Sequence, residues 1–128
     1  MRKLLTAILI LASTFTYSQS TLNFVKQFKV NTHEYFISNE DYDTQISTTN
    51  SNLITISAEI KANTNDRILN QLFKVGRYNI IIKNGEILLD RIKKIVFING
   101  VKLEENVTLN IQIPNGVILI NNTNTKLL

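Results

Sequence analysis

Few side chains in this sequence could do acid–base, nucleophilic or metal chemistry. His33 is the only histidine, and the chain contains no cysteine. A lone histidine beside Glu34, at the start of a predicted strand, is typical of a surface position and lacks the partners that nucleophilic catalysis needs. The absence of cysteine excludes thiol chemistry, disulfides and zinc sites of the cysteine type. We therefore predict no catalytic residue and no cofactor.

Three oxygen-bearing side chains alternate in one acidic segment, namely Asn39, Asp41 and Asp43. This alternation is typical of the first ligands of a calcium-binding loop. The segment lacks the glycine and the distal glutamate of an EF-hand loop, so a solvated acidic turn is favoured and calcium binding is the alternative. Glu40 and Asp43 could form an acid/base pair only across a cleft that nothing else in the sequence indicates. We predict no metal site.

A small basic cluster is formed by Lys83, Arg91, Lys93 and Lys94. A solvated strand face, or a strand edge that lysines protect from further pairing, is the favoured interpretation because Glu86 and Asp90 lie among the cations. The alternative is contact with an anionic surface such as lipopolysaccharide or lipid headgroups. The sequence has no phosphate loop, dinucleotide fingerprint or metal-ligand spacing. We therefore do not expect an enzyme, although a hydrolase with an unrecognised site stays as a weaker alternative.

The segment Met1–Ser18 has the pattern of a secretory signal. Arg2-Lys3 is a basic start, and Leu4–Ala12 is an apolar run too short to span a bilayer. We expect cleavage near Ser18-Gln19, where small residues precede the bond, and export to the periplasm or the medium. A single β-rich domain over residues 19–128 would remain. An uncleaved anchor is the alternative, and a lipid-anchored lipoprotein is excluded because no cysteine follows the apolar run.

The charge of the chain limits the classes of partner. The formal net charge is +4 at pH 7, and removal of Arg2 and Lys3 with the signal would leave 4 − 2 = +2. This is too small for the basic footprint of nucleic-acid-binding proteins. Beyond Ala12 no apolar run is long enough to cross a membrane. We therefore expect no nucleic-acid binding and no membrane span after signal cleavage.

The elements that would hold any site are mainly β-strands. Val107–Ile113 alternates apolar and polar residues, which predicts a strand with one buried face. Pro114-Asn115-Gly116 is a turn signal, and the apolar run Val117–Ile120 follows it as the second member of a predicted strand pair. Leu53–Ala62 shows the same alternation. Two shorter runs, Glu34–Ser38 and Thr44–Thr49, flank the acidic turn, and Ser20–Asn31 is a strand or an extended arm.

One segment has helical periodicity in place of alternation. Its apolar residues recur at spacings of three and four and are Ile68, Leu69, Leu72, Phe73 and Val75. Thr64, Asn65 or Asp66 could cap its start, and Gly76 suits a left-handed residue after its end. The pattern predicts one short helix over about residues 66–75.

Three Asn-Gly pairs, which are turn signals, occur in the second half of the chain. Asn84-Gly85 and Asn99-Gly100 each separate two apolar runs, as in β-hairpins, and Asn115-Gly116 supplies the third pair. Turn signals at regular spacing are typical of all-β domains. The predicted fold class is therefore mainly β, with antiparallel hairpins in a sandwich or solenoid-cap arrangement and one short α-helix.

The residues from Asn110 to Asn121 read N-I-Q-I-P-N-G-V-I-L-I-N and follow a strand of the form I-T-I-S-A-E-I and a short helix. This succession, after an export signal, resembles the opening section of the adhesin-like exported proteins of Gram-negative bacteria, of the head or GIN-domain type. The matching positions are Ile111, Ile113, Pro114, Val117, Leu119 and Asn121. In that family the segment leads into a β-solenoid, and this chain ends where the solenoid would begin. The resemblance implies no catalytic residues.

The last apolar run is the candidate binding element. Continuous apolar strands are normally covered on both faces, and a domain with one short helix has little with which to cover them. We predict that Val117, Ile118, Leu119 and Ile120 form an edge strand that pairs with a protein partner or a second copy. The alternative is that Thr123–Leu128 folds back over this strand.

The predicted function follows from this edge. We expect an exported, non-enzymatic, surface-associated or adhesin-like β module that acts by binding. A small periplasmic inhibitor, immunity-type or accessory protein that binds one protein partner is the alternative.

Overall fold

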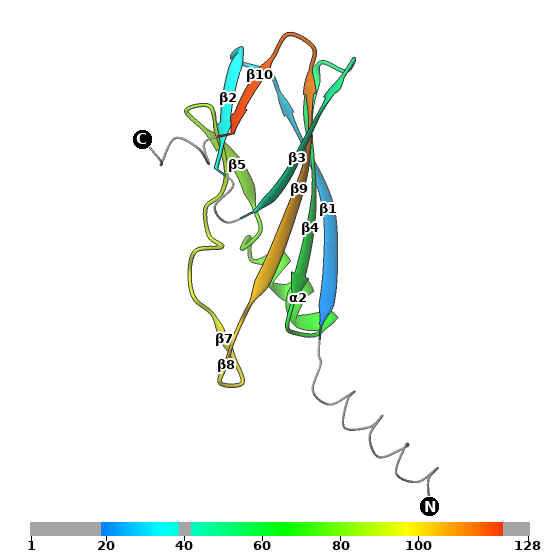
Figure 1. The fold of residues 1–128 in the computed structure, drawn as a ribbon. Helices are drawn as coiled ribbons and strands as arrows, with labels where there is room; N and C mark the ends of the chain where they lie inside the picture. Colours follow the sequence, from blue (N-terminus) through cyan, green and yellow to red (C-terminus); the bar gives the residue numbers. More distant parts are fainter. Residues whose placement is uncertain (1–18, 39–41, 122–128) are drawn as a thin grey trace, which may run out of the picture.

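The fold was derived from a computed structural model, which describes residues 19–38 and 42–121. The predicted signal segment, most of the acidic turn and the tail from residue 122 onward lie outside the described residues. The described chain is mainly β with one short helix, which confirms the predicted fold class. Figure 1 shows the strands running along the long direction of the molecule.

The first sheet contains the long strands. Its order is β1 (Ser20–Lys29), β4 (Leu53–Ala62), β9 (Glu105–Pro114) and β3 (Asp43–Thr49). Strands β1, β4 and β9 pair antiparallel, whereas β3 pairs parallel to β9. The ambiguous stretch after residue 19 is therefore a full strand, and its apolar Leu22, Phe24 and Phe28 lie opposite Ile60, Ala58 and Ile54 of β4.

The second sheet contains four short strands. Its order is β10 (Ile118–Asn121), β2 (Glu34–Ile37), β6 (Glu86–Leu89) and β5 (Ile80–Lys83). Strand β2 is parallel to both β10 and β6, and β5 and β6 form an antiparallel hairpin. A separate hairpin, β7 (Phe97–Ile98) and β8 (Val101–Lys102), lies beyond the end of this sheet.

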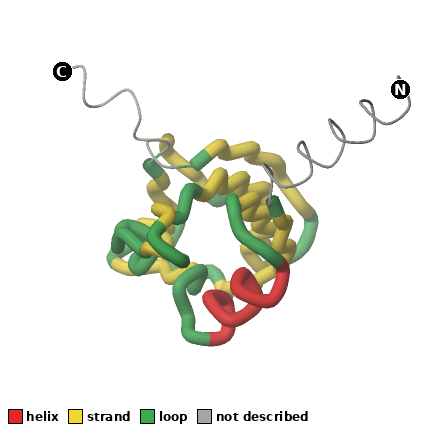
Figure 2. Tube along the Cα trace, turned by 90° about the horizontal axis from the view of Figure 1, so that it is seen from below, coloured by secondary structure: helices red, strands yellow, loops and turns green. Residues whose placement is uncertain are grey.

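One hydrophobic core fills the space between the two sheets. Because strand side chains alternate between faces, every second residue of β4 and β9 points inward, and these residues are almost fully buried. The second sheet contributes Tyr35, Ile37, Ile87 and Leu89 to the same core. Figure 2, seen from the lower end of Figure 1, shows strands surrounding this interior. The arrangement is a sandwich of two mixed sheets.

The helix α2 (Asp66–Lys74) forms where the periodicity predicts it. Of the three predicted capping residues, Asn65 is the N-cap: its side-chain Oδ1 accepts a hydrogen bond from the Ile68 amide at 2.9 Å. The left-handed Gly76 follows the end of the helix with φ 86°. Leu69 is buried, whereas Phe73 is 42% exposed and packs against Phe24 of β1, with ring centroids 5.1 Å apart.

Two of the three Asn-Gly pairs close hairpins as predicted. Asn84-Gly85 joins β5 to β6 and Asn99-Gly100 joins β7 to β8, with positive φ at all four residues, as a type I′ turn requires. The third pair behaves differently. The structure places β9 in the first sheet and β10 in the second, so the predicted pairing of Val107–Ile113 with Val117–Ile120 was wrong.

The reason is that the third turn has another geometry. Only Gly116 of this pair has positive φ, and the Val117 amide donates to the Pro114 carbonyl at 3.1 Å. The chain thus turns tightly but leaves the first sheet, and Ile118 bonds to the His33 carbonyl at 2.8 Å beside β2. The strands β2 and β3 on either side of the acidic turn likewise belong to different sheets.

Candidate functional site

Strand β10 lies at the outer edge of the second sheet, next to β2 alone among the described strands. The register pairs Leu119 with the buried Tyr35, so Leu119 faces the core. Ile118 and Ile120 therefore point to the outer face, and Ile118 is 57% exposed. The run Val117–Ile120 thus packs inward through some side chains and presents apolar side chains outward. On the side opposite β2, no described strand pairs with it.

The backbone of β10 is oriented for further pairing. The Ile118 amide points toward β2, where it donates to the His33 carbonyl at 2.8 Å. Successive amides along a strand point to opposite sides, so the Leu119 amide points away from β2, toward the open edge. Edge strands with free amide and carbonyl groups are templates for another strand unless charges, prolines or bulges protect them. Within Val117–Ile120 no residue is charged.

The outer face of the second sheet carries further apolar side chains near this edge, interrupted by Glu34 next to Ile118 and by Glu86 next to Phe36. The pairing register aligns Ile120 of β10 with Phe36 of β2, and Leu88 of β6 with Ile81 of β5. These side chains are only partly buried. We call this set the outer apolar face, and it comprises Phe36, Ile81, Leu88, Ile118 and Ile120. The first sheet offers the opposite case, because its outer face carries mostly polar side chains such as Gln27, Thr55 and Gln112.

Sequence reasoning identified only part of this surface. It found Ile118 and Ile120 but missed Phe36 and Leu88. The available signal was that Ile80–Ile82 and Ile87–Leu89 are continuous apolar runs, which indicates strands with apolar residues on both faces. Their alignment with β10 could not be read from the sequence, because it depends on parallel pairings between strands that are distant along the chain.

The residues considered for chemistry are not brought together by the described structure. His33 is exposed beside β2, and its backbone carbonyl accepts the hydrogen bond from the Ile118 amide of β10. Asp43 is exposed at the start of β3, whereas Asn39, Glu40 and Asp41 lie outside the described residues. Within residues 19–38 and 42–121, no group of three or more His, Asp or Glu side chains is arranged to hold a metal ion. The absence of enzyme activity stays a prediction.

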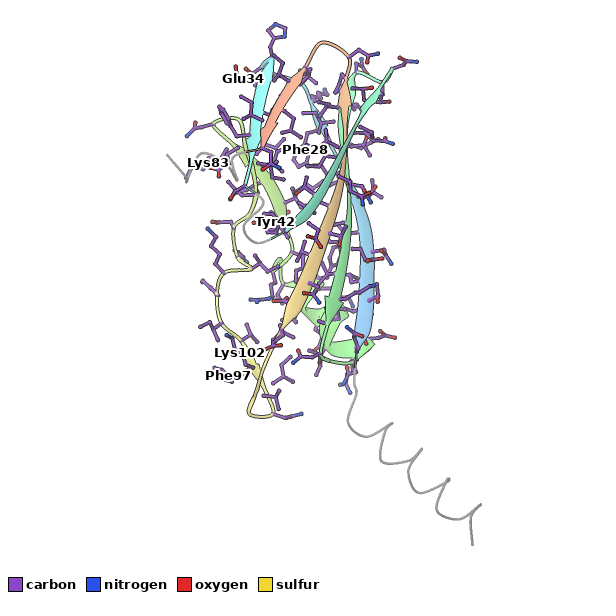
Figure 3. The ribbon with its side chains drawn as sticks, in the orientation of Figure 1. Phe28, Glu34, Tyr42, Lys83, Phe97 and Lys102 are labelled. Atoms are coloured by element: carbon purple, nitrogen blue, oxygen red, sulfur yellow. The ribbon has the colours of Figure 1, made fainter. Side chains whose placement is uncertain are left out.

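The basic cluster is divided between two places. Lys83 and Lys93 line a surface hollow of about 660 Å³ beside the end of β6, together with Glu86 and Asp90. Arg91 turns away from this hollow, and its guanidinium donates to the Val75 carbonyl at 3.0 Å. Figure 3 shows Lys83 on the outside of the second sheet. The four cations therefore do not form one patch.

A buried ion pair, which sequence reasoning missed, lies between the helix and the hairpin. The Arg77 guanidinium binds Glu105 through two bonds, Nη2 to Oε1 at 2.7 Å and Nε to Oε2 at 3.0 Å. Both side chains are only 7% exposed. The hydrogen bond to Glu105 raises the pKa of Arg77 above its ordinary value, so this arginine stays charged. No local motif marks the pair, since its members are 28 residues apart.

The same guanidinium organises the loop between β6 and β7. Arg77 Nη1 donates to the Lys94 carbonyl at 2.9 Å, and Nη2 donates to the Ile92 carbonyl at 3.2 Å. These bonds fix the backbone of a loop that has little regular structure. The neighbouring Tyr78 is fully buried, and its hydroxyl has no hydrogen-bond partner among the described residues. Burial, followed by the proximity of the Glu105 carboxylate, raises the pKa of Tyr78 well above its ordinary value.

No family model, curated protein or solved structure matches this chain. No helix in the described part of the chain is long and apolar enough to span a bilayer. The surfaces described above, and chiefly the edge at β10, are therefore the features that indicate a function.

Proposed function

We propose that the protein is an exported, non-enzymatic, surface-associated binding module of the adhesin-like kind, which takes up a partner strand along β10. The single observation that carries this proposal is the open edge of Val117–Ile120, with the side chains of the outer apolar face beside it. A partner strand beside β10 would satisfy the outward Leu119 amide, and its side chains would extend the sheet. This mode of recognition needs no catalytic residue and no cofactor.

The unusual feature that supports binding is apolar surface on the solvent side of the second sheet. An exposed sheet face normally carries polar side chains, as the first sheet does at Ser57 and Asn110. Exposed apolar side chains that gather on one face of a domain indicate an interaction site. The side chains of Ile118 and Ile120 are therefore the expected contacts of a strand that pairs with β10, and Phe36 of β2 lies one strand further in.

The proposal is tested by replacing Ile118 and Ile120 together with lysine. Their side chains point outward, so we expect the domain to stay folded while the two charges oppose strand addition. The full chain and the double variant are immobilised, and proteins retained from a cell-envelope extract are compared. Light scattering on both proteins reports self-association. The expected result is a partner or a dimer that the double variant loses.

The matched control is Val25→Lys with Gln27→Lys. Both residues are exposed on β1, which is an edge strand of the first sheet. We expect this control to retain whatever the wild-type chain binds. Equal binding by all three proteins would exclude the β10 edge, and a monomer with no retained protein in every case would contradict the binding function.

The same experiment addresses the alternative function. A small periplasmic inhibitor, immunity-type or accessory protein would retain one stoichiometric enzyme or transporter. A surface-associated module would retain an envelope structural protein or a second copy of itself. The identity of the protein that the double variant fails to retain decides between these two functions.

A further inference from the structure

A second surface, separate from the β10 edge, combines apolar and cationic side chains. We call it the basic hairpin segment and define it as Arg91–Lys102, the loop into β7 together with the β7–β8 hairpin. Three of its large apolar side chains are strongly exposed: Ile95 at 68%, Phe97 at 64% and Val101 at 59%. Its cations are Arg91, Lys93, Lys94 and Lys102, and it contains no Asp or Glu.

The hairpin presents these side chains at the end of the molecule. The register pairs Phe97 with Lys102, so an aromatic ring and a cation lie side by side on one face. Asn99 and Gly100 form the tip with φ values of 52° and 80°, and nothing lies within 4 Å of the position where a Cβ of Gly100 would be. Figure 3 shows Phe97 and Lys102 near the lower end of the described chain.

The backbone beneath this surface is held firmly. Arg77 binds the carbonyls of Ile92 and Lys94 from inside the domain. On the other side, the Asn63 side chain donates to the Lys102 carbonyl at 3.1 Å and accepts from the Glu104 amide at 2.8 Å. The segment is thus anchored at both ends of the hairpin, while its side chains remain outside. The exposure of Ile95 and Phe97 is consequently a feature of an ordered surface.

Folding does not account for these apolar side chains. The core is already filled by the two sheets, and Ile95, Phe97 and Val101 contribute little burial to it. Val75 is also 66% exposed, and its carbonyl accepts a hydrogen bond from Arg91, which places it beside the same segment. Clustered exposed apolar side chains in an ordered region indicate a surface that is covered when the protein works.

We propose that the basic hairpin segment docks onto an anionic phospholipid bilayer. Ile95 and Phe97 would enter the interfacial region, where aromatic and aliphatic groups leave water, and Lys94 and Lys102 would contact lipid phosphates. Charge complementarity favours this occupant, because Lys94 and Lys102 lie on a segment that contains no carboxylate of its own, and cations match an anionic headgroup surface. The convex shape also favours it, since a protruding tip enters a deformable interface more readily than a flat protein surface.

Membrane docking through the basic hairpin segment is independent of strand addition at β10. Figure 1 shows β7 and β8 at the lower end of the molecule and β10 toward the upper end. A bilayer bound to the hairpin would therefore leave the β10 edge turned away from the membrane. A module docked in this way could hold one partner at the membrane surface without crossing it.

The test uses the full chain with a local reporter, because the apolar run near the N-terminus could itself bind lipid. The chain contains no tryptophan, so Phe97→Trp introduces a single indole at the hairpin. Val25→Trp is the matched control, since Val25 is 62% exposed on the outer face of the first sheet. Each variant is mixed with vesicles of phosphatidylglycerol and phosphatidylcholine in equal amounts, with phosphatidylcholine vesicles, and with lipopolysaccharide micelles.

The expected result is a blue shift, and quenching by brominated lipid, for the Phe97→Trp indole with phosphatidylglycerol vesicles only. Adding Lys94→Gln and Lys102→Gln should lower the apparent affinity for these vesicles about 25-fold, which is about fivefold for each cation lost near the surface. Lys29→Gln with Lys83→Gln is the charge control and should change it little. High salt should weaken it, because exposed charges are screened.

Three results would overturn the proposal. The first is an unshifted Phe97→Trp indole with every lipid, and the second is an equal shift of the Val25→Trp indole. The third is a response to lipopolysaccharide micelles but not to phosphatidylglycerol vesicles, which would assign the surface to another ligand. Circular dichroism of each variant confirms folding, which is expected because every replaced side chain is exposed.

Discussion

Replacing Glu105 by glutamine should destabilise the domain strongly, although glutamine has nearly the same shape. The carboxylate binds Arg77 through two hydrogen bonds of 2.7 and 3.0 Å, and both side chains are 7% exposed. Removing one partner of a buried ion pair leaves an uncompensated charge, which typically costs about 3–5 kcal/mol. A domain of this size has a total stability of about 5–15 kcal/mol, so the loss would be a large fraction of it.

The same structure predicts that the two partners are not equivalent. Arg77→Met removes the ion pair and also leaves the Ile92 and Lys94 carbonyls without their donor. The double variant Arg77→Met with Glu105→Leu removes both charges but does not restore those two bonds. We therefore expect the double variant to be less stable than wild type and more stable than the summed losses of Arg77→Met alone and Glu105→Leu alone imply, with a coupling of about 1–3 kcal/mol.

Urea denaturation followed by circular dichroism measures these free energies of unfolding. Glu104→Gln is the matched control, because Glu104 is the exposed neighbour of Glu105 and should change stability by less than about 0.5 kcal/mol. Equal midpoints for the variants at Glu104 and Glu105 would refute the reasoning. Additive losses in the double variant would show that the two side chains do not interact.

Three further predictions follow from the helix, the buried tyrosine and the export signal. Leu69→Ala removes a buried side chain of α2 and should cost about 2–5 kcal/mol, whereas Asn70→Ala on the exposed side should cost little; equal thermal shifts would contradict the assignment of the buried face. The folded pKa of Tyr78 lies above its ordinary value of 10.0, so its contribution to stability is fully present below about pH 10 and is lost as the pH rises above it. Tyr78→Phe should have the same free energy of unfolding as wild type at pH 7 and lose less of it above pH 10. An identical loss of stability at high pH in both proteins would exclude ionisation of Tyr78 as its cause. Mass spectrometry of envelope-derived protein should find a chain beginning at or near Gln19, and an intact cytosolic chain beginning at Met1 would disprove export.

The local elements of the fold could be predicted because their signals are local. Alternation along Leu53–Ala62 and Val107–Ile113 places one face in the core, whatever strand lies beside it. Asn65 and Gly76 mark the ends of α2 through backbone bonds and a left-handed conformation that need no distant residue. Asn84-Gly85 closes a hairpin for the same reason.

The pairing of strands across the two sheets could not be predicted, because it depends on distant residues. The turn at Asn115-Gly116 specifies a reversal but not the sheet that receives β10. That choice depends on Leu119 packing beside Tyr35, which is far away in the sequence. The ion pair between Arg77 and Glu105 is likewise a contact that no local sequence pattern predicts. For the candidate site, the run Val117–Ile120 was visible in the sequence, but Phe36 and Leu88 became part of it only through the strand order.

Hydrogen exchange at the backbone amide of Leu119 tests the central claim most directly. This amide points away from β2, so it should exchange rapidly in dilute, isolated protein. When the protein is concentrated, or mixed with the protein that the Ile118→Lys, Ile120→Lys variant fails to retain, the account predicts strong protection at Leu119. Strand β3, the edge of the other sheet, serves as the internal reference and should not change. Protection that appears at β3 and leaves Leu119 exchanging freely would contradict the assignment of β10 as the binding edge.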